Sequence, residues 1–277
     1  MSALAATRPP GGRTSRLALL AVVNLAGLAA FVWPFLLPQA VGGEEAHELD
    51  APFVFALLLV CLGALLFVEL GRGGMGPKAV ALIGVLGAAM VALRLPGFVF
   101  GFSAMFIVVL VAGNAFGPGF GFVLGAIGTF ASGMFIGGVG PWLPFQMVAI
   151  GWIGAGAGLI PKPSNPSARV VILAVYGFAA GFLFGLVINL WFWPFAAGSS
   201  NLGWVPEAGP AENLSRYLRF YAVTSFFPWD TFRAVGNAAL VLLLGRPLLA
   251  SLDRAARRMA LHLGPDHRLP AAPDPSA

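Results

Sequence analysis

Apolar runs about as long as a membrane-spanning helix recur along the whole of this 277-residue chain. A helix needs roughly 20 mostly apolar residues to cross the hydrocarbon core of a bilayer. Charged residues make up only 10% of the chain and its mean hydropathy is +0.87, whereas a soluble domain is typically about 25% charged. The sequence therefore predicts an all-α polytopic membrane protein.

Eight runs have the length and the composition of a membrane-spanning helix. In chain order they are Leu17–Leu37, Pro52–Leu70, Ala79–Leu95, Gly101–Phe116, Gly119–Ile136, Pro144–Ile160, Val170–Phe195 and Pro228–Leu249. Arginines precede the first run, as they would in a signal peptide. Its apolar part is long and no good cleavage site follows it, so we expect an uncleaved membrane anchor.

Basic residues gather on one side of an eight-span arrangement. That side receives Arg8, Arg13, Arg16, Arg72, Lys78, Lys162, Arg169, Arg254, Arg257 and Arg258. The opposite side receives the acidic segment GGEEAHELD and few basic residues: Arg94, Arg216 and Arg219. Because basic residues are retained in the cytoplasm, both termini are predicted to be cytoplasmic. In the outer loop before the last span, the segment ENLSRYLRFYAVTSF is predicted to form a short interfacial helix.

The residue types that bind metals and nucleotides form no recognisable pattern. The histidines, His47, His262 and His267, lie in polar segments, and the single cysteine, Cys61, lies inside an apolar run. No phosphate-binding loop motif is present, so ATP-driven transport would need another chain to hydrolyse ATP. The basic residues are scattered singly rather than clustered, which does not fit a nucleic-acid surface. We therefore expect no metal, no cofactor, no nucleic acid and no catalytic residue.

Small residues recur at four-residue spacing in several spans, and such stripes allow helices to approach closely in lipid. Three stripes are explained by packing within the bundle: Gly121 and Gly125; Gly154 and Gly158; Gly177, Gly181 and Gly185. A fourth stripe, in the third span, consists of Gly84, Ala88 and Ala92. This stripe either packs within the bundle or docks a helix of another protein.

Polar and aromatic residues collect near the outer ends of several spans. They are Arg94, Ser132, Trp142, Gln146, Asn189, Trp191, Asp230 and Arg233. A cavity with aromatic walls and a few polar anchors is what a small ligand needs, so these residues are predicted to bind a substrate. The alternative is that the tryptophans, with Trp193, form the interfacial aromatic belt and that Arg94 reaches the headgroups.

Two charged residues, Asp230 and Arg233, stand three positions apart in the otherwise apolar last span. Pro228 is a favourable first helical residue, and the dipole of a helix favours an anion in its first turn. Residues three apart on a helix can form an ion pair. The pair is therefore predicted at a helix start near the outer surface, where it either sets the depth of the helix or turns one member toward the cavity.

Three motifs occur in order along the chain. The third span ends in ALRLP after its small-residue stripe, and the run from Gly113 to Pro161 contains GPGFGF and then GPWLPFQM. The last span begins FFPWDTFRA, with Asp230 and Arg233 in a P-x-D-x-x-R-A pattern. Together these motifs resemble the substrate-binding S components of energy-coupling factor (ECF) transporters, which take up vitamins.

The resemblance implies a fold, partners and a location. It implies a six-helix substrate-binding core at 79–249, preceded by a cytoplasmic segment (1–16) and two additional transmembrane helices (17–70), and followed by a cytoplasmic tail (250–277), disordered at its end. Ala88 and Ala92 match the A-x-x-x-A face that docks on the transmembrane coupling subunit, which works with two cytoplasmic ATPases. The location implied is the cytoplasmic (inner) membrane of a bacterium, and the mechanism is a rotation of the S component within the membrane.

The substrate and the class of protein leave alternatives open. The GPW-x-P-x-Q-M segment is similar to that of S components assigned to cobalamin-like substrates, so the resemblance makes a corrinoid the first candidate substrate. Thiamine precursors, other vitamins and modified nucleobase precursors remain open. One rival is a membrane enzyme, which would need clustered carboxylates or histidines at one depth, where only Asp230 qualifies. Another rival is a scaffold protein, which would explain the glycine stripes but not the convergence of polar residues.

Overall fold

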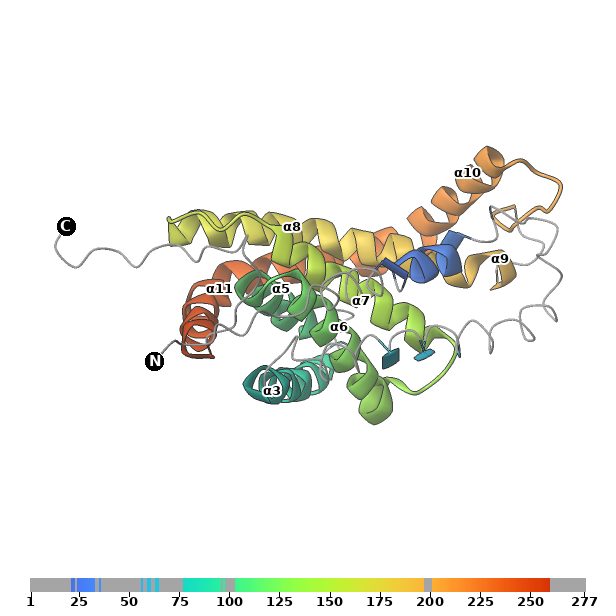
Figure 1. Cartoon of the computed structure of the whole chain (residues 1–277). Coiled ribbons are helices and arrows are strands. Elements are labelled where there is room, and N and C mark those ends of the chain that lie inside the picture. The colour runs from blue at the N-terminus through green and yellow to red at the C-terminus, as the bar shows by residue number, and fades with distance from the viewer. Residues whose placement is uncertain are drawn as a thin grey trace.

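The structure is a computed structural model, and it describes residues 21–22, 24–32, 35, 56, 59–60, 63–64, 77–95, 97, 103–196 and 201–259. Its main helices are α3 (Pro77–Arg94), α5 (Met105–Phe116), α6 (Pro118–Ser132), α7 (Trp142–Leu159), α8 (Pro166–Ile188) and α11 (Thr231–Met259). Short helices α9 (Trp193–Ala196) and α10 (Pro210–Tyr221) lie between α8 and α11 in the chain (Figure 1).

These helices are those of a multi-pass membrane protein. Within the described part of the chain, five helical stretches are long and apolar enough to cross a bilayer, and α5 is a shorter apolar helix. The part of the chain that the structure describes contains no β-strand. The predicted all-α polytopic fold is therefore confirmed.

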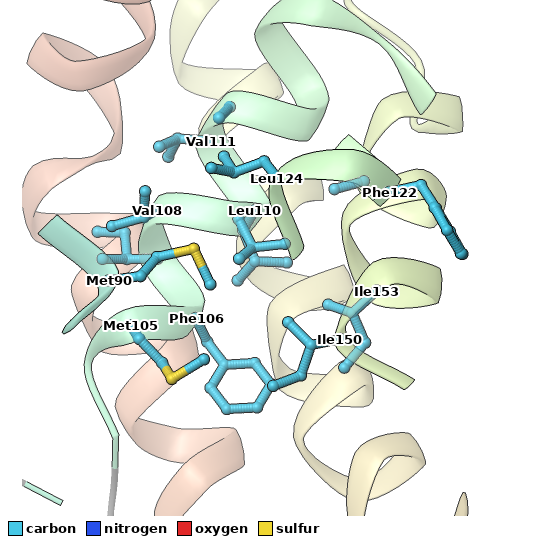
Figure 2. Close-up of a cluster of buried hydrophobic side chains, with 14 of the residues drawn as sticks. Met90, Met105, Phe106, Val108, Leu110, Val111, Phe122, Leu124, Ile150 and Ile153 are labelled. Carbon is cyan, nitrogen blue, oxygen red and sulfur yellow. The ribbon is translucent and has the colours of Figure 1, made fainter. Parts of the chain in front are cut away.

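Helix α5 is the centre of the bundle. All 12 of its residues are buried, so the neighbouring helices cover its whole circumference. Figure 2 shows Phe106 and Leu110 of α5 packed among Met90 of α3, Leu124 of α6 and Ile150 of α7. Because protein rather than lipid surrounds α5, this helix need not itself match the thickness of the bilayer.

Local sequence signals fix where α5 ends and where α6 and α8 begin. Gly117 ends α5 with φ of 97°, a backbone conformation that glycine adopts most readily, and Pro118 then starts α6. Asn165 caps α8, because its side chain accepts hydrogen bonds from the backbone N–H groups of Ser167 (2.9 Å) and Ala168 (3.3 Å).

The glycine stripes bring helix backbones into direct contact. A Cβ added at Gly121 of α6 would collide with the carbonyl group of Gly154 of α7. A Cβ at Gly181 of α8 would lie 2.6 Å from the Cα of Ala234 of α11. The predicted packing role of these stripes is confirmed, and α8 and α11 run side by side as a result (Figure 1).

A polar network joins the helices at the end of the bundle where α5 and α7 finish. Arg169 of α8 donates to Asn114 of α5 (2.7 Å) and forms a bidentate ion pair with Asp253 of α11 (2.6 and 3.2 Å). Lys162, between α7 and α8, donates to the carbonyl of Ala115 (3.3 Å). Burial lowers the pKa of Lys162, Arg169 lowers it further, and Asp253 opposes both.

The last helix differs from its predicted bounds at both ends. Pro228 does not begin it, because residues Ala222–Asp230 form a π-helical stretch that continues α10 directly into α11. At the other end α11 runs ten residues beyond Leu249, to Met259, although it contains Pro247. The predicted interfacial segment does form helix α10, but it is not separated from the last helix by a break.

Few residues before α3 are described. Those in 21–35 are helical, and Asn24 accepts a hydrogen bond from Trp152 Nε1 of α7 (2.5 Å), while Phe31 packs on Phe145 and Trp152. Most of the second predicted span, the acidic segment and the tail after Met259 lie outside the described residues. The predicted division into two extra helices, a core and a tail stays a prediction.

The glycine contacts yield a prediction for stability. We expect Gly154→Ala to lower the free energy of unfolding by about 1–3 kcal/mol, the usual cost of overpacking, because its Cβ would meet the carbonyl of Gly121. Gly84→Ala is the control, since nothing lies within 4 Å of a Cβ there. Thermal unfolding in detergent measures both, and equal stability of the two variants would contradict the prediction.

Candidate functional site

A cavity of about 230 Å³ opens at the end of the bundle where α3 and α8 finish and α5, α7 and α11 begin. It is lined by Arg94, Gly97, Ser103, Met105, Phe106, Gln146, Ile150, Phe184 and Arg233. Each main helix except α6 contributes at least one of these residues, directly or just beyond its end. The close packing described above therefore positions the cavity walls.

Arg94, the last residue of α3, lies at one side of the cavity. Its guanidinium donates to Ser132 Oγ (2.8 Å) and more distantly to Gln146 Oε1 (3.5 Å). Gly137 packs behind it, since a Cβ on that glycine would lie 2.6 Å from Nη2 of Arg94. The guanidinium is thus held in place by α6, α7 and the turn between them.

Arg233 also lines the cavity and forms the predicted ion pair with Asp230. The Asp230 side chain is fully buried and also accepts a hydrogen bond from Ser225 Oγ (3.0 Å). A Cβ at Gly185 of α8 would collide with the Asp230 carboxylate, so this glycine makes room for the buried acid. The ion pair is present as predicted, in the last π-helical turn and the first turn of α11.

Aromatic rings complete the wall beside Arg233. The guanidinium carbon lies 4.7 Å from the ring centroid of Phe184 and 5.9 Å from that of Phe106. At these distances the cation is attracted to the ring faces. Arg233 is therefore fixed by one carboxylate and two rings while still bordering the cavity.

The other predicted site residues lie away from the lining. Trp142 is 37% exposed beside Gly138 and Gly140, at the start of α7. Asn189, which caps the C-terminal end of α8, is buried and donates to the carbonyl of Gly185 in that helix (2.7 Å). Trp191 stacks on Phe145 (centroids 5.3 Å apart).

Ser132 and Asp230 do not line the cavity but contact the two arginines that do. Ser132 accepts a hydrogen bond from Arg94, and Asp230 forms the ion pair with Arg233. The structure thus brings Arg94, Gln146 and Arg233 together at the cavity and places Ser132 and Asp230 directly behind them. It leaves Trp142, Asn189 and Trp191 outside the lining.

Sequence reasoning missed several lining residues: Gly97, Ser103, Met105, Phe106, Ile150 and Phe184. The apolar members belong to spans in which most positions are apolar, so nothing in the sequence marks them. Ser103 is the exception, because a hydroxyl at the start of an apolar span is a weak polar signal. Its Oγ is buried and has no hydrogen-bond partner among the described residues.

A second cluster of aromatic residues lies beside the cavity end, where α10 packs on the end of α8. Trp193, Tyr217 and Tyr221 are buried there, and the Tyr217 hydroxyl donates to the carbonyl of Leu186. Burial, with Tyr221 and Asp230, raises the pKa of Tyr217, so its hydroxyl stays protonated. This cluster attaches α10 to the bundle.

The small-residue stripe of α3 lies on the surface. Gly84, Ala88 and Ala92 are all exposed, whereas Gly87 is buried, with Gly128 of α6 close to it. The stripe is therefore not used for packing among the described residues, and the docking role predicted for it stays a prediction.

The bundle of long apolar helices is that of a multi-pass membrane protein. Its small cavity, with a few polar anchors, is suited to hold a ligand. The family model of the ECF transporter substrate-specific component matches residues 78–245, well over half of the chain. The chain belongs to this family of substrate-specific components. No curated protein and no solved structure matches the chain significantly.

Membership confirms the resemblance drawn from the three motifs, which all lie within or beside the matched residues. Members of this family are membrane subunits that capture small-molecule substrates and work with a coupling transmembrane subunit and ATPases. They are transporter components and not enzymes.

The ion pair of Asp230 and Arg233 yields a second prediction. We expect Asp230→Asn and Arg233→Gln each to destabilise the protein by about 3 kcal/mol, because each leaves a buried charge without its partner. The double variant should lose less free energy of unfolding than the two single variants lose together, with a coupling energy of about 0.5–3 kcal/mol. Thermal unfolding in detergent gives the four values of the cycle.

The exposed pair of Glu212 and Arg216 in α10 provides the control cycle. Exposed pairs on a helix contribute only about 0.3–0.5 kcal/mol, so its variants should be close to neutral. Strict additivity at Asp230 and Arg233 would contradict the coupled pair and would mean that the two residues act separately.

Proposed function

We propose that the cavity between Arg94 and Arg233 is the site at which this subunit captures its substrate for an ECF-type uptake transporter. The observation that carries the proposal is the convergence of charged, polar and aromatic side chains from five helices on one cavity. In a bundle made mostly of apolar residues, intramembrane charges mark ligand paths more often than they serve packing.

The chemistry of the lining favours binding over catalysis. Its charged groups are both arginines, which do not lose their protons in proteins and are poor general bases. Among the described residues, no group of three or more histidines, cysteines or carboxylates could hold a metal. A membrane enzyme would need such groups, so substrate capture explains the cavity better.

The size of the cavity favours a small substrate. Pockets for drug-sized ligands measure about 300–1,000 Å³, and the cavity is about 230 Å³. A corrinoid exceeds drug size, so we now place a small vitamin or vitamin precursor ahead of it.

The direction of capture follows from the distribution of charge. The cavity lies at the end of the bundle that carries Arg94, whereas Lys162, Arg169 and Arg254 lie toward the other end. By the positive-inside rule we therefore expect the cavity to face outward and both termini to lie in the cytoplasm of a bacterial cell.

Docking on the coupling subunit is proposed for the exposed stripe of α3. We expect Ala88→Trp or Ala92→Trp to abolish association with the coupling subunit, because a side chain that large holds the two helices apart. Co-expression of the chain with the coupling subunit and ATPases of the same genome, followed by affinity purification, measures the association. This experiment also tests the proposed function itself.

The matched control is Val175→Trp, at an exposed position on α8. It should leave the association intact, and all three variants should keep the stability of the wild type. Wild-type protein that never assembles with a coupling subunit would contradict the proposed function. Normal assembly of the Ala88 and Ala92 variants would mean that the docking surface lies elsewhere on the protein.

The cavity itself yields a prediction for binding. We expect Gln146→Ala to weaken binding of the small molecule that co-purifies with the protein at least about tenfold, or 1.4 kcal/mol. Trp142→Ala, outside the lining on the same helix, should bind nearly normally. Titration in detergent after identification of the compound by mass spectrometry measures both, and the reverse order of effects would place the site at the tryptophan.

A further inference from the structure

The charges around the cavity do not cancel. Arg94 and Arg233 contribute two positive charges, and Asp230 supplies one negative charge through its ion pair with Arg233. The carboxylates of Glu212 and Asp253 pair with other arginines. No carboxylate among the described residues pairs with Arg94, so the described groups leave one positive charge at the cavity.

Unused hydrogen-bond donors accompany this charge. A guanidinium has five N–H donors in a planar fork, and two hydrogen bonds to described side chains, one of them at 3.5 Å, leave the fork of Arg94 incomplete. Ser103 Oγ is buried at the same cavity, and no described residue is its hydrogen-bond partner. A buried donor that stays unsatisfied costs free energy, and a ligand oxygen would remove that cost.

Apart from Gln146, which accepts from Arg94, and Arg233, the rest of the lining is apolar. Its apolar members are Met105, Phe106, Ile150 and Phe184, and the rings of Phe106 and Phe184 lie against Arg233, whose own charge is already paired. A ligand that fills the cavity therefore meets both the cationic, donor-rich guanidinium of Arg94 and the aromatic rings beside Arg233.

We infer that the cavity selects a small molecule with a single carboxylate attached to an apolar or aromatic body. Arg94 is its ion-pair partner, Ser103 donates to it, and Phe106 and Phe184 contact the body. A carboxylate fits better than a phosphate monoester, which carries about −1.5 to −2 charges at neutral pH and would exceed the single positive charge. This inference rests on the proposed function and names the substrate class of the same site.

The test compares acids with their neutral amides on the full-length protein in detergent. The probes are benzoate and benzamide, nicotinate and nicotinamide, and biotin and biotinamide, which differ within each pair in charge but hardly in shape. A ligand that binds only the folded state raises its melting temperature. We expect at least one acid to raise the melting temperature and its amide to leave it unchanged.

Variants then test which residues make the cavity prefer the acid over its amide. Arg94→Gln should weaken binding of that acid about 10- to 100-fold, the range expected for a hydrogen bond to a charged group. Ser103→Ala, which removes one hydroxyl from a site without a partner, tests the same contact if the arginine variant folds poorly. Arg216→Gln, in α10 and outside the cavity lining, should bind normally and controls for a general loss of positive charge.

Two results would overturn the inference. One is a panel in which no acid stabilises the protein more than its amide. The other is an acid that binds equally well to the Arg94 and Ser103 variants. Failure of the proposed function is separate, because assembly with the coupling subunit depends on the exposed stripe of α3 and not on the cavity. If the chain assembles with the coupling subunit but binds amides better than acids, the proposed function stands and the inferred carboxylate substrate is wrong.

Discussion

Direct contact between helix backbones at glycine is the constraint on which this structure depends. Gly121 and Gly154 bring α6 and α7 together beside the fully buried α5, and Gly181 does the same for α8 against α11. In lipid, helices gain little from burying apolar surface, so close packing supplies much of their association. The cavity lies where these closely packed helices reach the end of the bundle, and Gly185 extends this packing to the carboxylate that holds Arg233.

The fold could be predicted from the sequence because each span is long, apolar and bounded by turn residues. The third to the sixth predicted spans match helices of the structure within a few residues, whereas the seventh runs on past the end of α8 at Ile188 and into α9. The last span was predicted less well, since Pro228 was interpreted as a helix start. A π-helical stretch accommodates this proline within a continuous helical segment, and no sequence pattern distinguishes that outcome from an ordinary helix start.

The polar anchors of the candidate site could also be predicted, and its walls could not. Arg94, Gln146 and Arg233 were identifiable because polar side chains are rare in these spans. Phe106 and Phe184 look like every other phenylalanine of an apolar run, and only the packing of α5 against α8 turns them toward Arg233. The tryptophans were identifiable as residues, but periodicity gave no means to tell a cavity wall from a membrane interface.

Family membership makes this chain a substrate-capture subunit, and the cavity beside Arg94 and Arg233 is the site that we propose for that role. The most direct test is an experimental structure of the protein purified with the small molecule that it retains from the cell. The account predicts that this molecule lies between Arg94 and Phe184, in contact with the Arg94 guanidinium. A ligand bound elsewhere, with this cavity filled only by water or lipid, would contradict it.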